Sequence, residues 1–218
     1  MAQCVEFAKK DLRLEVRSGE ALLVTTPFGA VALLLVPVAV GTDTPLLRQV
    51  GPGMYWVVVL VFGVLVTLRQ SAVDGSAQLA MLRLSGVHPA VRLAGRAMAN
   101  AGVLLLFEAA LVPVAIVLYD PLLDGWAWLL PVFPLVAVGL AVLGTFADAL
   151  ARGLAGRTAL GPLLVVPLAL PLLLSATQVM EATRYARSPG PWLLLLVTVD
   201  LIVILALTLT ARHLEEIG

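Results

Sequence analysis

Two acidic residues of this sequence stand in strongly apolar surroundings, where a carboxylate is expensive. Glu108 lies within VLLLFEAALV and Asp200 within LLLLVTVDLIVI. A charged side chain at the centre of a bilayer costs about 2.5–3.5 kcal/mol even on insertion scales, and such residues usually mark function. Two interpretations stay open for each acid: a functional group, or a carboxyl that is protonated or hydrogen-bonded to a neighbouring helix or a second subunit.

The other residues that could carry chemistry are few. Cys4 is the only cysteine, which excludes an internal disulfide and a multi-cysteine metal site. The two histidines are His88 and His213, and no GxSxG or HExxH motif occurs. The only lysines, Lys9 and Lys10, are not part of a GxxxxGK[ST] motif, so a phosphate-binding P-loop is not available. We therefore expect that the chain is not an enzyme, that it has no metal site and that it binds no cofactor directly.

Apolar runs of membrane-spanning length make up most of the chain. Its residues are 61% hydrophobic and 13% charged, whereas soluble domains average about 45–50% apolar and about 25% charged. A helix needs about 20 apolar residues to cross the hydrocarbon core. Six segments reach or approach that length, at residues 22–40, 53–68, 97–118, 126–147, 162–180 and 192–211. The sequence predicts an all-α, polytopic membrane protein.

Basic residues predict the orientation of these spans. Eleven of the 14 lysines and arginines fall before the first span, after the sixth, or in the 69–96 and 148–161 connections. The opposite connections hold only Arg48, Arg184 and Arg187. Because basic residues stay on the cytoplasmic side, both termini are expected there. No basic residue falls inside a predicted span, so no ion pair is expected within the membrane. The zero net charge does not favour a nucleic-acid partner.

Three shorter segments have predicted roles. Residues 1–21 have a helical spacing of apolar and basic residues that is typical of an interfacial helix, and the first apolar run is expected to be a retained span rather than a cleaved signal. Residues 41–52 are expected to be an outside loop, with Pro52 in the first turn of the second span. Residues 212–218 are expected to be a cytoplasmic tail.

The longest polar interruption, residues 69–96, is the predicted contact with a soluble partner. Residues 77–84 could form a short helix with an apolar face, a form that suits a groove on another protein. The candidate coupling residues are Arg69, Asp74, Gly75, Leu79, Leu82 and Arg96. A simple connector between spans is the alternative. Since the chain lacks a P-loop, energy for transport would have to come from such a partner or from an ion gradient.

The fifth span contains three prolines, Pro162, Pro167 and Pro171. A proline inside a helix removes one backbone hydrogen bond and bends the helix. The spacing of these prolines predicts a span that either flexes during a transport cycle or is only shaped for packing.

Several motifs resemble the CcmB family, whose members are permease subunits of the cytochrome c maturation ABC transporter. The motifs are DLRLEVRS at 11–18, PGMYW at 52–56, DGS at 74–76 and GRTALGPLLVVPLALPLLLSAT at 156–177. The resemblance covers essentially the whole chain. The sequence differs from the family pattern in having Asp74 alone before the glycine and Arg96 where a lysine is usual.

This resemblance implies an ABC-2-like exporter permease in the bacterial cytoplasmic membrane. It implies a homodimer bound to a cytoplasmic ATPase, CcmA, and associated with CcmC, CcmD and the heme chaperone CcmE. ATP hydrolysis by CcmA would drive release of heme-loaded CcmE from CcmC, or heme export. The complex would handle heme and ATP, whereas this chain has no histidine on the predicted outer side to ligate heme.

Two other functions are compatible with the sequence. One is an ABC-2-type exporter permease for a lipid, a glycan or a drug. The other is a membrane scaffold that assembles other proteins and transports nothing. An associated ATPase would favour the transporter readings, and its absence would favour the scaffold.

Overall fold

The structure is a computed structural model, and it describes residues 20–41, 43–73, 89–121, 126–153 and 160–216. These residues form long α-helices with short connections and contain no strand. The helices are α2 (Glu20–Val40), α3 (Thr44–Val73), α5 (Pro89–Tyr119), α6 (Leu129–Gly153), α7 (Leu160–Arg184) and α8 (Gly190–Glu216), and the 3₁₀ turn η1 (Trp126–Trp128) precedes α6. All six helices are long and apolar enough to cross a membrane, so the predicted all-α polytopic fold is confirmed.

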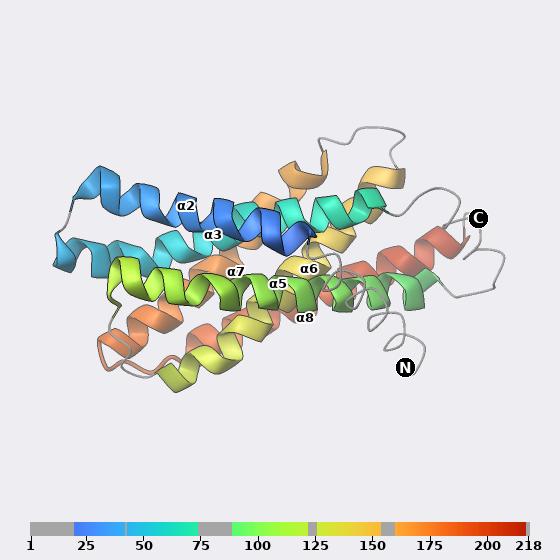
Figure 1. The fold of residues 1–218 in the computed structure, drawn as a ribbon. Helices are drawn as coiled ribbons and strands as arrows, with labels where there is room; N and C mark the ends of the chain where they lie inside the picture. Colours follow the sequence, from blue (N-terminus) through green and yellow to red (C-terminus); the bar gives the residue numbers. More distant parts are fainter. Residues whose placement is uncertain (1–19, 42, 74–88, 122–125, 154–159, 217–218) are drawn as a thin grey trace.

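The six helices lie roughly side by side and alternate in direction (Figure 1). The connections α2–α3, α5–α6 and α7–α8 meet at one end of the bundle, which we call the outer end after the orientation that the basic residues predict (Figure 1). We call the opposite end the inner end. Helix α6 is central, because it packs against α3, α5, α7 and α8.

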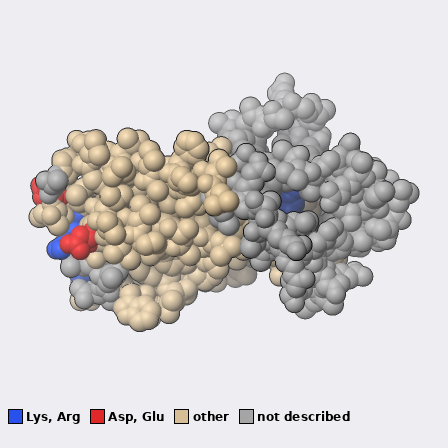
Figure 2. Space-filling model, in the orientation of Figure 1, with Lys and Arg blue, Asp and Glu red and all other residues tan. Residues whose placement is uncertain are grey.

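Exposure of the apolar side chains separates the inner helices from the peripheral ones. Within their spanning windows, 56% of α3 and of α6 is buried, against 17% of α2 and 22% of α8. Leu35 and Val38 on α2 and Leu201 on α8 are exposed. Figure 2 shows charged side chains at the outer end and an uncharged flank beside it. Such a flank suits contact with lipid or with another apolar helix.

Helix α3 begins at Thr44, earlier than the sequence predicted. The prediction of a loop over residues 41–52 is therefore wrong. The connection is only Gly41–Asp43 long, with Gly41 at φ +88°. The Leu47 amide donates to the Asp43 carbonyl over 2.9 Å, which starts the helix. Pro45, rather than Pro52, therefore occupies the first turn, where a missing N–H costs nothing. Pro52 lies inside the helix.

The helices also extend beyond the predicted spans at the inner end. Helix α3 continues to Val73 and α5 begins at Pro89, so Arg69 and Arg96 are helical rather than part of a loop. Helix α8 continues to Glu216, which makes most of the predicted 212–218 tail helical. The apolar run ends where polar residues begin, but arginine, glutamine and glutamate are good helix formers, so the helix continues beyond the apolar run.

Candidate functional site

The predicted coupling residues divide between described helices and residues outside them. Arg69 lies near the end of α3, and Arg96 lies in the second turn of α5. Asp74, Gly75, Leu79 and Leu82, with the predicted helix at 77–84, lie outside the described residues. The interfacial helix predicted at 1–21 also lies outside them, except for the first two residues of α2.

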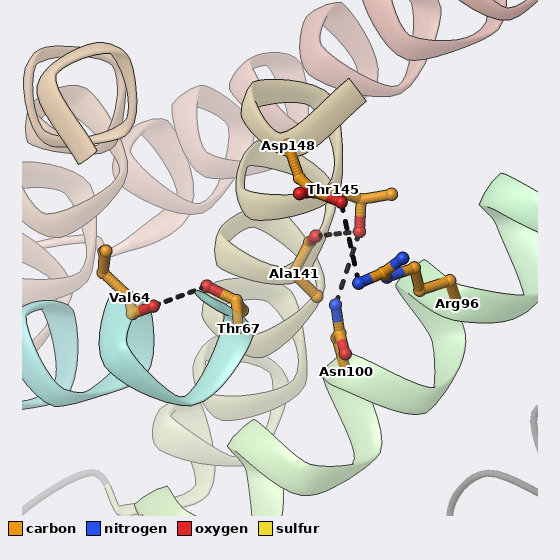
Figure 3. A network of polar contacts seen from close by, with 7 residues as sticks. All are labelled: Val64, Thr67, Arg96, Asn100, Ala141, Thr145 and Asp148. Carbon is orange, nitrogen blue, oxygen red and sulfur yellow. Dashed lines mark hydrogen bonds and ion pairs between the residues drawn. The ribbon is translucent and has the colours of Figure 1, made fainter. Parts of the chain in front are cut away.

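Arg96 joins α5 to α6 through an ion pair near the inner end (Figure 3). Its guanidinium Nη2 lies 3.6 Å from Oδ2 of Asp148, and both side chains are largely buried, at 13% and 15% exposure. The sequence predicted no ion pair within the membrane, and it did not indicate this pair. Both residues fell just outside the predicted apolar runs, although the bundle surrounds them.

A second polar contact lies one turn further into the bundle (Figure 3). Asn100 Nδ2 donates to Thr145 Oγ1 over 3.5 Å, and the Thr145 hydroxyl donates to the Ala141 carbonyl over 2.7 Å. Residues four apart on a helix share a face, so Arg96 and Asn100 form one polar stripe on α5. Asp148 and Thr145 form the matching stripe on α6. This spacing was the signal in the sequence that could have found the pair.

Helix α3 reaches the same part of α6 through a close contact at Gly144. A Cβ built on Gly144 would lie 2.9 Å from Thr67 Oγ1 and 3.0 Å from Thr67 Cβ. Any larger side chain here would force Thr67 to shift, whereas glycine lets the two helices approach closely. The Thr67 hydroxyl donates to the Val64 carbonyl of its own helix over 2.8 Å (Figure 3). We call Thr67, Arg96, Asn100, Gly144, Thr145 and Asp148 the inner polar cluster.

Glu108 is fully buried in α5, far along the helix from the inner polar cluster. Neither carboxyl oxygen has a hydrogen-bond partner among the described residues. The Tyr55 hydroxyl donates to the backbone carbonyl of Glu108 over 2.8 Å, which ties α3 to α5 beside the carboxyl. The Tyr55 ring packs edge-on against Trp56, at a centroid distance of 5.0 Å. A buried polar group without a partner is costly to fold, which keeps the functional interpretation of Glu108 open.

Asp200 is 4% exposed and faces the junction of α6 and α7. A Cβ on Gly139 of α6 would collide with Oδ1 of Asp200, and it would lie 2.6 Å from Leu172 Cδ1 of α7. Gly139 therefore provides the space that the carboxyl occupies. Both carboxyl oxygens lack a hydrogen-bond partner among the described residues. Within those residues, no group of acidic, histidine or cysteine side chains could hold a metal ion.

The three prolines of the fifth span lie in α7, which is continuous from Leu160 to Arg184. Pro167 and Pro171 are inside the helix, and Pro162 falls in its first turn. The Ser175 hydroxyl donates to the Pro171 carbonyl over 2.7 Å, and the Thr177 hydroxyl donates to the Leu173 carbonyl over 2.8 Å. Hydroxyls that bond back to carbonyls commonly accompany bends in helices.

At the outer end, residues at the end of α5 link this helix to α2 and α3. Arg48 of α3 donates from Nε to the Asp120 carbonyl over 2.9 Å, and its guanidinium also pairs with the Asp120 carboxylate. The Tyr119 hydroxyl donates to the Leu33 carbonyl of α2 over 2.7 Å. A Cβ on Gly51 would lie 2.7 Å from Tyr119 Cβ, so α3 presses against that ring. These contacts were not predicted from the sequence.

Comparison with known proteins gives consistent matches over most of the chain. The family model described as CcmB protein matches residues 2–215. The chain is 30% identical over 181 residues to heme exporter protein B of Haemophilus influenzae, covering 82% of this chain and 81% of that protein. It is 31% identical over 214 residues to heme exporter protein B of Pseudomonas aeruginosa, covering 92% and 89%. The protein of the same name from Paracoccus denitrificans is 30% identical over 198 residues, covering 88% of each chain.

Proposed function

The chain belongs to the CcmB family, and from this premise we propose that it is the membrane subunit of an ATP-driven transporter that serves cytochrome c maturation. A separate cytoplasmic ATPase, CcmA, hydrolyses ATP. The energy is used to release the heme-loaded chaperone CcmE from CcmC, or to export heme. The proposal includes a homodimer in the bacterial cytoplasmic membrane, associated with CcmC and CcmD and with both termini in the cytoplasm.

The inner polar cluster is the observation that carries this proposal. The stretch 74–88 connects the end of α3 to the start of α5. Helix α3 contacts α6 at Gly144, and α5 contacts α6 at Asp148. A force applied to this stretch by an ATPase would therefore reach α6, which packs against α3, α5, α7 and α8. A connection of this kind is what a subunit without its own P-loop needs in order to respond to ATP hydrolysis elsewhere.

A mechanical role is preferred to heme carriage by this chain. Heme iron in proteins is ligated by histidine, methionine, cysteine or tyrosine. Both histidines fall on the predicted cytoplasmic side of the sequence. Of the tyrosines at the outer end, Tyr119 is engaged with α2, and the Tyr185 ring is flanked by two arginines. Purified homodimer is expected to bind no heme without its partners. Stoichiometric heme binding by the homodimer alone would overturn this part of the proposal.

Copurification with the ATPase tests the proposal. Affinity capture of the wild-type chain from membranes is expected to recover a cytoplasmic ATPase, and Leu79→Asp or Leu82→Asp is expected to abolish that recovery without lowering the amount of chain in the membrane. A matched control is Leu46→Asp, since Leu46 is exposed at the outer end. Failure of the wild-type chain to recover any ATPase would instead favour the scaffold reading.

A second measurement distinguishes the cytochrome c role from an exporter for a lipid, a glycan or a drug. Deletion of this chain is expected to abolish c-type cytochromes while heme-loaded CcmE accumulates bound to CcmC. Normal c-type cytochromes in the deletion strain, with an ATPase still recovered by the chain, would leave an exporter permease of another substrate class.

A further inference from the structure

A hollow of about 220 Å³ opens at the outer end, between the start of α3 and the end of α7. Arg48 and Gln49 line it from α3, Met180, Glu181 and Arg184 from α7, and Pro121 from the segment after α5. The hollow is separate from the inner polar cluster and from the buried acids Glu108 and Asp200. No function proposed above uses it.

The hollow holds one cation and one anion that remain available to a ligand. Glu181 and Arg184 are both exposed and lie one turn apart on α7, yet neither forms an ion pair with another described residue. The Arg184 guanidinium lies over the Tyr185 ring, at 5.7 Å from its centroid. Arg48, by contrast, is already paired with Asp120. A ligand that carries an anion and an ammonium close together would satisfy both free charges at once.

The position of the hollow indicates a lipid as the source of that ligand. The apolar window of α7 ends at Arg184, and the turn Trp126–Trp128, which packs against α7, exposes 62% of Trp126 and 46% of Trp128. Exposed tryptophans gather at the level of lipid headgroups. The charged hollow therefore lies at the headgroup level of the outer leaflet.

An apolar path for acyl chains leads away from the hollow along α7. Leu170 and Leu174 are 59% and 53% exposed. With 3.6 residues per turn, positions 170, 174 and 181 lie within a narrow sector of the helix. A lipid whose headgroup contacts Glu181 could thus lay its chains over Leu174 and Leu170 toward the centre of the membrane.

From these observations we propose that the hollow binds a phospholipid whose headgroup carries a phosphate and a primary ammonium, as in phosphatidylethanolamine. Arg184 donates to the phosphate, and Glu181 accepts from the ammonium N–H groups. A choline headgroup has no N–H to donate, and a glycerol headgroup has no cation. The proposal holds whether or not the chain acts in cytochrome c maturation, since it uses no residue of the inner polar cluster.

Lipid retention by the full chain tests this site. The purified chain would be delipidated, incubated with equimolar short-chain phosphatidylethanolamine, phosphatidylcholine and phosphatidylglycerol, and examined by native mass spectrometry. Phosphatidylethanolamine is expected to be retained about twofold to fivefold more than either of the other lipids, as expected for one charge-assisted contact at an exposed site. Equal retention, or preference for phosphatidylglycerol, would overturn the proposal.

Variants separate the two charges. Glu181→Gln is expected to remove the preference for phosphatidylethanolamine over phosphatidylcholine, whereas Arg184→Gln is expected to weaken retention of both. Arg187→Gln is the matched control, because Arg187 also contacts the Tyr185 ring, at 5.7 Å, but does not line the hollow. An unchanged preference in Glu181→Gln would contradict the assignment, and so would an equal loss in Arg187→Gln. Thermal melting would verify that each variant is folded.

A final arm distinguishes a lipid from a soluble compound with the same headgroup. Glycerophosphoethanolamine has the phosphate and the ammonium but no acyl chains. If the path over Leu170 and Leu174 contributes, this compound is expected to displace the bound lipid poorly even in large excess. Displacement at equimolar concentration would overturn the lipid assignment.

Discussion

At the scale of single residues, Gly139 shows how closely α6 packs against its neighbours. Replacement by alanine would drive a methyl group into Asp200 of α8 and Leu172 of α7. Both neighbouring side chains are buried, at 4% exposure for Asp200 and 0% for Leu172, so either must shift against packed neighbours to admit the methyl group. We expect Gly139→Ala to destabilise the chain by about 1–3 kcal/mol, the usual cost of overpacking, and to lower the melting temperature measured in detergent.

Gly53→Ala provides the control for this substitution. A Cβ at Gly53 would meet nothing within 4 Å, and alanine favours a helix over glycine by about 0.8–1.0 kcal/mol. Its melting temperature is expected to stay the same or rise. If both alanine variants melted like the wild type, the close approach at Gly139 would not exist.

Glu108 and Asp200 are tested by substitutions that keep their size. Glu108→Gln and Asp200→Asn are expected to insert and accumulate normally, because an amide fits the same space and carries no charge. Each is expected to reduce the assembly of c-type cytochromes, measured by heme staining of membrane proteins. Normal assembly in both variants would assign the two acids a purely structural role.

The sequence could identify these acids but not their surroundings. An acidic residue within an apolar run can be recognised from the sequence alone, so Glu108 and Asp200 could be predicted as intramembrane residues. The space that Gly139 leaves for Asp200 depends on the contact between α6 and α8. Such contacts between distant segments are not encoded in hydropathy.

At the scale of helices, the ion pair between Arg96 and Asp148 links α5 to α6 near the inner end. Arg96→Gln and Asp148→Asn are each expected to destabilise the chain by about 1–3 kcal/mol, the usual cost of a buried polar group that loses its partner. Assembly of c-type cytochromes is expected to fall in both, although the ATPase should still copurify. The measurements are thermal melting, heme staining and affinity capture.

A charge exchange separates a link between helices from a loss of packing. The double variant Arg96→Asp with Asp148→Arg restores opposite charges across the same two helices and is expected to recover part of the stability and of the assembly. Arg96→Asp and Asp148→Arg alone are the matching single variants, and a loss of stability in the double variant that is smaller than the sum of their two losses would measure the coupling. Strictly additive losses would contradict a direct link.

Helix α7 offers a different test, because its prolines remove backbone hydrogen bonds. Pro171→Ala restores an amide that can bond to the Pro167 carbonyl, and we expect it to raise the melting temperature. If α7 flexes in the transport cycle, assembly of c-type cytochromes falls in the same variant. Pro134→Ala in α6 is the control, since Pro134 also lies inside a helix but outside the predicted flexing span. Normal assembly in Pro171→Ala would leave packing as the role of this proline.

The extent of the helices could be predicted only in their apolar parts. Hydropathy located the six spans, because a membrane helix must be apolar over its full crossing. It could not find the start of α3 at Thr44 or its end at Val73, since both lie among polar residues that tolerate helix or loop. Pro45 is the signal for the true start, but Pro52 beside an aromatic pair gives a similar signal further along the chain.

At the scale of the whole molecule, the proposed roles of the two ends of the bundle both depend on its orientation in the membrane. The hollow between α3 and α7 and the Arg48–Asp120 contact lie at the outer end, whereas α3 and α5 meet the proposed ATPase-binding stretch at the inner end. The charge bias that predicts this orientation is a property of the sequence alone. It therefore calls for a measurement that reports the side of the membrane directly.

The single cysteine makes this measurement simple. In intact spheroplasts, a membrane-impermeant maleimide is expected to leave Cys4 unlabelled, and permeabilisation is expected to make it reactive, because the N-terminus is predicted to be cytoplasmic. In a Cys4→Ser background, Arg187→Cys at the exposed α7–α8 connection is expected to react in intact spheroplasts. The opposite labelling would show that the bundle has the reverse orientation in the membrane. The stretch 74–88 would then lie where no ATP is available, and both the proposed coupling and the outer-leaflet assignment of the hollow would fail together.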